Sequence, residues 1–175
     1  MKKGTRGFSL IELLIVVAII LIIAAIAIPN LLRSRIAANQ ASAVGSLRTL
    51  NTAEVTYSTT YNTGYSATLS DLGPPAASAP TPTATAAGLI DEVLAGMASA
   101  GGAPVANSYT SSKSGYTFVY TPGATTGTSI TTYTITASPI SPGTTGTNYY
   151  YTDQSGVIRQ NSTTTASSTD SPLAG

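Results

Sequence analysis

The sequence predicts an α+β protein, in which one long N-terminal α-helix packs on a C-terminal antiparallel sheet of about four strands. Three observations predict this fold. An apolar run near the N-terminus leads into residues with helical spacing, Pro and Gly then interrupt regular structure, and the last third alternates between apolar and polar residues. A length of 175 residues suits one domain with a buried core.

The composition excludes several kinds of site. The chain has no His and no Cys, so it can form no Ser-His-Asp triad, no Cys nucleophile, and no zinc, haem or iron–sulfur site through those residues. Charged residues make up 9% of the chain, against ~25% in typical soluble domains. Beyond the first seven residues acidic side chains outnumber basic ones, which gives no electrostatic case for nucleic acid. We expect no cofactor, no metal and no direct nucleic-acid binding.

An uncharged, mostly aliphatic segment runs from Leu13 to Leu32. About 20 apolar residues cross a bilayer core as a helix. Three cations precede the segment and Arg33 and Arg35 follow it, which weakly favours a cytoplasmic N-terminus. The segment is longer than the ~7–15 residues of a secretory h-region, and no A-x-A-like site follows it. We therefore expect a retained, single-pass membrane helix.

Glu12 breaks the apolar pattern at the front edge of this segment. A charged side chain at the centre of a membrane helix costs roughly 2.5–3.5 kcal/mol on insertion scales, and less near the interface. An ionisable group in a membrane segment is therefore a functional candidate. The alternative is that Glu12 only marks the membrane boundary.

The N-terminal third of the chain resembles type IV pilin precursors and the related prepilin-like proteins. The resemblance covers Met1–Tyr61 and rests on a basic leader ending Arg6-Gly7, the motif Phe8-Ser9-Leu10-Ile11-Glu12, and an unbroken aliphatic run with Pro29. It implies a type IV pilin-like fold. It also implies cleavage between Gly7 and Phe8 by a membrane prepilin peptidase, which then N-methylates Phe8.

The resemblance also implies a role for Glu12 in subunit assembly. Its carboxylate can neutralise the methylated Phe8 amine of another subunit. At ~4 Å and an effective dielectric of 20, this attraction is about 4 kcal/mol before desolvation. Desolvation offsets much of this attraction, so the pair would set the register between subunits more than the strength of their association.

The partners implied by the resemblance are further copies of the chain, the prepilin peptidase, an inner-membrane assembly platform and a motor ATPase. The protein would first lie in the inner membrane as a single-pass protein with its N-terminus in the cytoplasm. It would then move into the pilus at the cell surface.

The resemblance and the residues together divide the chain into six segments. Residues 1–7 are the prepilin leader, 8–32 the transmembrane and filament-core helix, 33–61 the amphipathic second half of that helix, 62–115 a variable loop with a short helix, 116–161 the antiparallel sheet, and 162–175 a Ser/Thr-rich tail. We expect this tail to be poorly ordered.

Helical spacing carries the prediction for residues 33–61. The apolar stripe consists of Ala37, Ala41, Val44, Leu47, Leu50, Tyr57 and Tyr61, and the polar side of Arg35, Gln40, Ser46, Arg48, Asn51 and Glu54. Pro29 has no backbone N–H and costs ~3 kcal/mol inside a helix, so it predicts a kink or a locally unwound turn. We interpret Gly45 as a close-packing position.

Spacing also predicts the remaining elements. Ala87–Ser99 predicts a short helix, and Leu69 and Leu72 are expected to pack one turn against the long helix. Alternation or β-propensity predicts four strands, at Tyr116–Thr121, Ser129–Ala137, Tyr149–Thr152 and Val157–Gln160, with Asp153 to Gly156 as the last hairpin turn.

Other candidate sites have weaker support. Asp91, Glu92 and Asp153 supply carboxylates, but calcium needs six to eight oxygens, and we interpret Asp153 as a turn residue. Asn161-Ser162-Thr163 matches a glycosylation sequon, a match near chance in a chain so rich in Ser and Thr. Phe8, Tyr57 and Tyr61 are the aromatic residues of the long helix, and we favour packing over electrical conduction for them.

The resemblance implies a structural subunit of a type IV pilus, not an enzyme, that serves adhesion, twitching motility or DNA uptake. The alternatives are a minor pilin or a type II secretion pseudopilin, and a bitopic surface protein that never polymerises. Many pilins carry a C-terminal Cys pair that this chain lacks. Its sheet must therefore hold the last segment by hydrogen bonds and packing, or leave it mobile.

Overall fold

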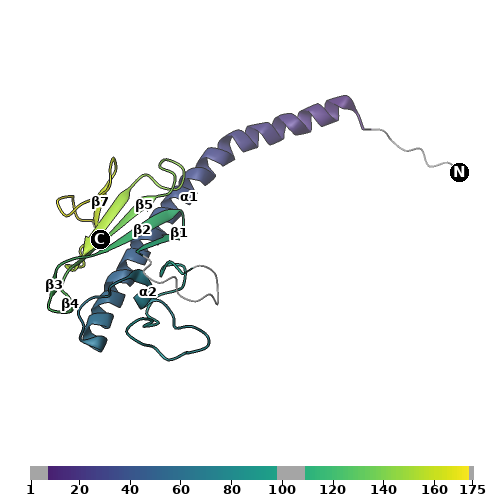
Figure 1. Cartoon of the computed structure of the whole chain (residues 1–175). Coiled ribbons are helices and arrows are strands. Elements are labelled where there is room, and N and C mark those ends of the chain that lie inside the picture. The colour runs from purple at the N-terminus through teal and green to yellow at the C-terminus, as the bar shows by residue number, and fades with distance from the viewer. Residues whose placement is uncertain (1–7, 98–108, 174–175) are drawn as a thin grey trace. The chain divides into compact units, whose positions relative to one another are not determined.

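The computed structural model describes residues 8–97 and 109–173, which fall into two compact units, Met1–Arg35 and Ile36–Gly175. One helix, α1 (Leu10–Tyr61), supplies most of the first unit and begins the second. Gly7 of the expected cleavage site lies outside the described residues. Figure 1 shows α1 followed along the chain by α2 and the strands.

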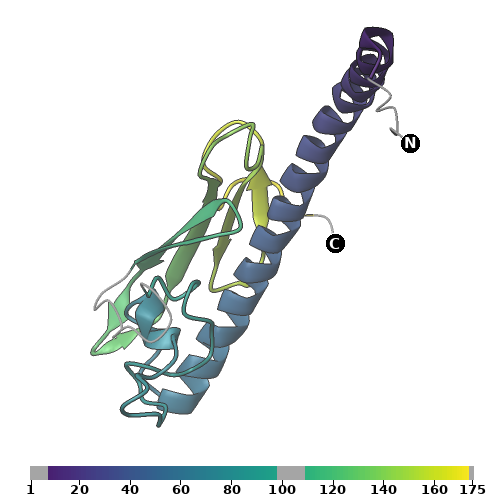
Figure 2. The same cartoon turned by 90° about the vertical axis from the view of Figure 1, so that its right-hand side faces the viewer.

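The second unit contains an antiparallel sheet of five strands in the order β1-β2-β5-β6-β7. Their bounds are Thr110–Lys113, Tyr116–Pro122, Tyr133–Pro139, Tyr149–Asp153 and Arg159–Asn161. The sheet lies along the second half of α1 (Figure 2). This confirms the predicted α+β class, with five strands in place of about four.

Alternation along the strands builds the core of this unit. Tyr116, Phe118 and Tyr120 of β2 are at most 1% exposed, and the antiparallel register places Phe118 opposite Ala137 and Tyr120 opposite Ile135. Period-two spacing puts these side chains on one face, where they meet α1. The predicted helix stripe is confirmed at Val44, Leu47, Leu50 and Tyr57.

Two residues assigned to the polar side of α1 are buried, which corrects that part of the prediction. Ser46 is 7% exposed and Glu54 is fully buried. At the other end of the stripe, Ala37 and Ala41 are exposed. Core packing therefore runs from Ala43 to Tyr57, about four turns of helix.

The run Ser129–Ala137 forms two strands instead of one. β4 (Ser129–Ile130) pairs with β3 (Thr125–Thr126) in a separate two-stranded ribbon, and β5 begins at Tyr133. The reason lies at the base of the ribbon, where the Thr131 N–H donates to the Ala124 carbonyl and the Gly123 N–H donates to the Thr132 carbonyl. These bonds close the ribbon on itself and interrupt the strand.

The short helix expected over Ala87–Ser99 is absent from its described part, residues 87–97, in which only 92–96 form turns. The Asp91 carboxylate accepts a hydrogen bond from the Leu94 N–H, and Gly96 adopts a φ of 70°. A positive φ stops helix propagation, so a single turn forms. Leu94 and Met97 still pack in the core. The last two residues of the expected helix, 98 and 99, lie outside the described part of the chain.

The helix that does form is α2 (Leu69–Leu72), held by a capping box. Asp71 N donates to Thr68 Oγ1 at 3.3 Å, and Thr68 N donates to Asp71 Oδ2 at 2.9 Å. Such reciprocal bonds satisfy donors that a helix start leaves unpaired. Leu69 and Leu72 are fully buried, as expected for a turn packed into the core.

The described part of the tail, residues 162–173, folds back on the sheet, contrary to the expectation of poor order. Leu173 N donates to the Ile158 carbonyl at 2.7 Å, and Gln160 N donates to the Ser171 carbonyl at 3.0 Å. Arg159 Nη1 also donates to the Asp170 carbonyl at 2.9 Å. Hydrogen bonds and packing thus hold the C-terminal segment on the β7 edge.

Candidate functional site

The described chain begins at Phe8, just before α1, and Phe8 is 77% exposed. Glu12 lies in the first turn of α1 and accepts a hydrogen bond from the Ser9 N–H, with 2.9 Å between N and Oε2. This is the helix-to-cap arm of a capping box. Within one chain, the Glu12 carboxylate therefore binds the backbone of Ser9, the residue that follows Phe8.

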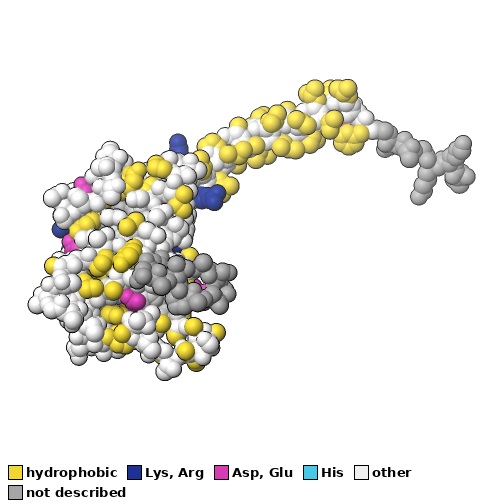
Figure 3. Space-filling model, in the orientation of Figure 1, with side chains coloured by type: hydrophobic (Ala, Val, Ile, Leu, Met, Phe, Trp, Pro, Cys, Tyr) yellow, Lys and Arg dark blue, Asp and Glu magenta, His cyan; other side chains and the backbone are white. Residues whose placement is uncertain are grey.

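The first half of α1 exposes nearly all of its apolar surface. Large aliphatic side chains from Leu10 to Leu32 are between 42% and 79% exposed. Figure 3 shows hydrophobic side chains covering the visible face of this segment. The helix is long and apolar enough to cross a membrane. Burying one such side chain is worth about 1.5–3 kcal/mol, so this surface strongly favours lipid or a protein partner.

Helical structure continues through Pro29. Proline carries no N–H, so the Ala25 carbonyl has no helical donor at that position. One turn later, Ser34 Oγ donates to the Asn30 carbonyl at 3.0 Å. The described helix has no unwound turn here, and a kink at Pro29 stays a prediction.

A shallow groove of about 190 Å³ lies near the end of the apolar segment, lined by Ile28, Leu31, Leu32 and Arg35. Arg33 and Arg35 are exposed. The only ion pair among the described residues is Lys113–Asp91, so neither arginine has an acidic partner there. Basic side chains thus mark the end of the apolar segment, as they do at a membrane interface.

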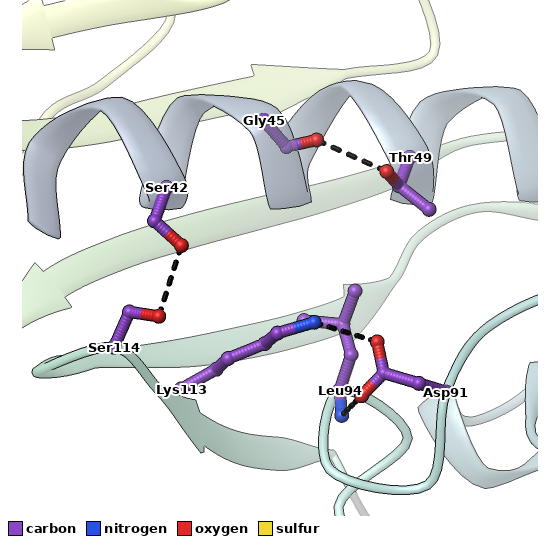
Figure 4. Close-up of polar contacts among 7 residues, drawn as sticks. All are labelled: Ser42, Gly45, Thr49, Asp91, Leu94, Lys113 and Ser114. Carbon is purple, nitrogen blue, oxygen red and sulfur yellow. Dashed lines mark hydrogen bonds and ion pairs between the residues drawn. The ribbon is translucent and has the colours of Figure 1, made fainter. Parts of the chain in front are cut away.

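Polar side chains of α1 bind the sheet and the loops that connect its strands. Asn39 Nδ2 donates to the Thr145 carbonyl and Asn51 Nδ2 to Thr152 Oγ1, each at 2.8 Å. Ser42 Oγ lies 2.9 Å from Ser114 Oγ at the tip of the β1–β2 hairpin (Figure 4). These bonds fix helix and sheet in register. Helical spacing alone could not predict them, because their partners lie far along the chain.

The main feature missed from the sequence is Glu54. Its Oε1 accepts from Ser66 Oγ at 2.6 Å, and its Oε2 accepts from Ser66 N at 2.9 Å. Burial raises the pKa of Glu54 from an ordinary 4.5 to about 7, although the Ser66 hydrogen bonds oppose the shift. Desolvation disfavours the charged form by more than the hydrogen bonds favour it, so the net effect is a raised pKa.

The weaker candidates of the sequence have local structural roles. Asp91 Oδ2 pairs with Lys113 Nζ at 2.6 Å (Figure 4). Partial burial would raise the pKa of Asp91, but the hydrogen bonds from Lys113 and Leu94 outweigh it and lower the pKa. Asp153 accepts from the Ser155 N–H at 2.9 Å, which confirms it as a turn residue.

Among the described residues, no group of three or more His, Cys, Asp or Glu side chains could hold a metal ion. The amide of Asn161 in the glycosylation sequon is already bound. Its Nδ2 donates to Asp170 Oδ1 at 2.8 Å and its Oδ1 accepts from Thr163 N at 2.9 Å. Tyr57 and Tyr61 lie with ring centroids 4.9 Å apart, an ordinary packing contact.

Comparison with known proteins bears on the N-terminal segment. Residues 2–28 match the family model described as the prokaryotic N-terminal methylation motif. A stretch of 52 residues is 52% identical to the type IV major pilin protein PilA of Myxococcus xanthus. A stretch of 37 residues is 62% identical to the type IV wide pilus major component PilA4 of Thermus thermophilus. The chain thus carries an N-terminal methylation motif and is similar over part of its length to type IV pilins.

The two pilin matches cover only part of each chain. The first match covers 30% of this chain and 24% of its relative, and the second covers 21% and 28%. The chain thus spans about a quarter of the length of the curated pilins it matches. No solved structure matches it. The fold of the chain is also consistent with that of a pilin, because it has a long N-terminal helix and an antiparallel sheet.

Proposed function

We propose that the protein is a structural subunit of a type IV pilus, cleaved between Gly7 and Phe8, N-methylated on Phe8 and polymerised into a surface filament. The observation that carries the proposal is the first half of α1. Its aliphatic side chains are exposed all round, and its front edge carries one carboxylate, Glu12. The methylation motif over residues 2–28 and the two pilin relatives support the same role.

The physical argument is a transfer of the apolar helix from lipid to protein. Helices packed against each other bury the same side chains that lipid would cover, and the charged Glu12 then needs a cationic partner. The Phe8 amine of a neighbouring copy supplies that charge. The globular unit, with its polar Ser- and Thr-rich surface, would lie on the outside of the filament.

Processing and assembly would require a prepilin peptidase, an inner-membrane assembly platform and a motor ATPase. Before assembly the chain would lie in the inner membrane with its N-terminus in the cytoplasm. Adhesion, twitching motility and DNA uptake are the functions that such a filament would serve. The structural role needs no catalytic residue of this chain.

Mass spectrometry of the N-terminal peptide tests the proposal, with sheared surface material and membranes analysed separately. We expect a peptide that begins at methylated Phe8 and is abundant in the sheared material. The same peptide confined to membranes would indicate a minor pilin or a type II secretion pseudopilin. A peptide that still begins at Met1 or Lys2 in both fractions would contradict the proposal and indicate a bitopic surface protein.

A further inference from the structure

Glu54 occupies a core position on the second half of α1, where a carboxylate is unusual. The side chain is fully buried, as is Ser66, which binds it. Buried carboxylates are normally paired with a cation or a metal. Among the described residues, however, the only ion pair is Lys113–Asp91. The partners of Glu54 are the backbone N–H and the hydroxyl of Ser66.

These bonds join three parts of the domain. Ser66 belongs to the segment 62–68, which connects α1 to α2. Its N–H and hydroxyl bind Glu54 of α1, and its carbonyl accepts from the Tyr120 hydroxyl of β2 at 2.7 Å. Every polar group of Ser66 is therefore used. One residue of α1 and one of β2 therefore hold the segment through Ser66.

Among the described residues, the other titratable groups that face Glu54 include no cation, although a hydrogen bond with the Tyr120 hydroxyl lowers the Glu54 pKa. They are Tyr57 of α1, Asp71 of α2, Tyr120 of β2 and Tyr133 of β5. Asp71 raises the pKa of Glu54 further, since two carboxylates repel each other. Tyr120 and Tyr133, themselves buried, have raised pKa values and stay neutral.

Protonation removes the cost of the buried charge without loss of a hydrogen bond. At 2.6 Å, the contact between Glu54 Oε1 and Ser66 Oγ fits a bond in either direction, with the carboxyl O–H or the hydroxyl as donor. The Ser66 N–H can donate to the second carboxyl oxygen in both states. Proton loss therefore leaves the same contacts around a charge that has no cationic partner among the described residues.

The chain offers few other groups that titrate near neutral pH. It contains no His and no Cys. Other carboxylates with resolved shifts, such as Asp91 and Asp153, are held below their ordinary pKa by hydrogen bonds that outweigh partial burial. A change in the globular unit between pH 5 and 8 would thus be traced to Glu54.

We propose that Glu54 is a proton-operated clasp, which holds the segment 62–68 on α1 and β2 when protonated and loosens it on losing its proton. The direction follows from linkage. The folded state binds the Glu54 proton more tightly than the unfolded state does, so stability is greatest below the ordinary pKa and is lost as pH rises towards and past neutrality. The clasp belongs to the globular unit and does not depend on the pilus proposal.

The first test is unfolding of the full-length chain in detergent micelles, followed by near-ultraviolet circular dichroism of its ten Tyr residues. From about pH 5 to about pH 8.5, we expect the folding equilibrium constant of the natural chain to fall on the order of a hundredfold. Glu54→Gln keeps the shape and the hydrogen-bonding atoms but cannot ionise, so its stability should not change with pH. Glu92→Gln is the matched control and should retain the fall.

The second test measures Glu54 in the natural chain and so needs no variant of that residue. The protein has three Glu residues, so carbon-13 labelling of the Glu carboxyl groups gives three signals. The spectra of Glu92→Gln and Glu12→Gln identify two of them, and the third belongs to Glu54. We expect the Glu54 signal to titrate near neutral pH. Amide exchange in 62–68, corrected for its intrinsic pH dependence, should accelerate with the same midpoint.

Three results would overturn the proposal. The first is stability of the natural chain that does not change over this pH range, and the second is an unchanged fall in Glu54→Gln. The third is acceleration of exchange to the same extent in β2 and β5 as in 62–68, because that pattern would show general loosening of the domain and no local clasp.

Discussion

Glu12 and Glu54 both lie on α1, and their surroundings give the two carboxylates different roles. Glu12 stands in the first turn and binds the Ser9 N–H, while Glu54 is enclosed by the core and binds Ser66. The sequence marks Glu12 because it interrupts an apolar run. Helical spacing also favours a core position for Glu54, since it follows Leu50 by four and precedes Tyr57 by three, but its residue type argues for the polar face.

Two substitutions of Glu12 separate its charge from its hydrogen bond. Gln can still accept from the Ser9 N–H but carries no charge, whereas Val loses both. If the charge pairs with the Phe8 amine, both variants should be processed and both should yield roughly tenfold fewer filaments, which corresponds to about 1.4 kcal/mol. The measurement is the amount of processed protein in sheared and membrane fractions.

Each outcome of this experiment is informative. Filament numbers near normal in Glu12→Gln would show that the local hydrogen bond matters and the charge does not. Normal numbers in Glu12→Val would remove Glu12 from assembly altogether. An uncut precursor in either variant would instead assign Glu12 to recognition by the peptidase.

At the scale of elements, the β1–β2 hairpin shows where the sequence is informative and where it is not. β1 is Thr-Ser-Ser-Lys, with no apolar alternation, so its residues alone do not predict a strand. The signal lies in the turn, where Ser114 and Gly115 both have a positive φ, as in the two-residue turns that suit hairpins. By contrast, β2 and β5 alternate clearly, and the alternation predicts both.

Replacing Gly115 by Ala should destabilise the β1–β2 hairpin by more than the cost of placing Ala at a positive φ. Gly115 has a φ of 76°, and a Cβ there would come within 2.9 Å of Asn39 Nδ2 and Thr145 Cβ. Gly127→Ala is the matched control, because Gly127 has a φ of 63° but open space around it. We expect a loss of about 1–2 kcal/mol in the control from the backbone alone.

The crowding at Gly115 should add about 1–3 kcal/mol to that loss. Thermal unfolding of both variants in detergent measures the difference. Equal losses would mean that Asn39 and Thr145 move aside freely, and that the hairpin tip is not fixed against α1.

The C-terminal segment shows how composition alone can mislead, because a Ser- and Thr-rich stretch with few apolar residues predicts poor order. Its order comes from long-range contacts that composition does not reveal. Leu173 packs against the core, and backbone bonds from 171–173 join the segment to Ile158 and Gln160. Pairing of this kind also protects the edge of a sheet from other chains.

Deletion of residues 171–175 should therefore destabilise the domain and expose an edge strand. Two backbone hydrogen bonds and the packing of Leu173 are lost, which together are worth about 2–4 kcal/mol. We expect a lower unfolding temperature by circular dichroism, and aggregation by light scattering at concentrations that the natural chain tolerates. A deletion that leaves both unchanged would show that the segment contributes nothing to the fold.

At the scale of the whole molecule, the two units differ in what their surfaces require. The first exposes nearly all of its aliphatic side chains, whereas the second buries most of its own in a core. A fragment of residues 36–175 should therefore be soluble without detergent and show the tyrosine near-ultraviolet signal of the full chain. The full chain should need lipid, detergent or polymerisation. An unfolded fragment would mean that the domain depends on the apolar segment.

The hydrogen bonds between α1 and the sheet also affect the order in which the chain is targeted and folded. Asn39, Gln40 and Asn51 each bind a residue that lies more than 100 positions later in the chain. A ribosome therefore releases the apolar segment long before the partners of the helix exist, and contacts so distant in sequence form slowly. Delivery of the N-terminal helix to a membrane can therefore be completed while the domain is still unfolded, before a folded domain could obstruct it.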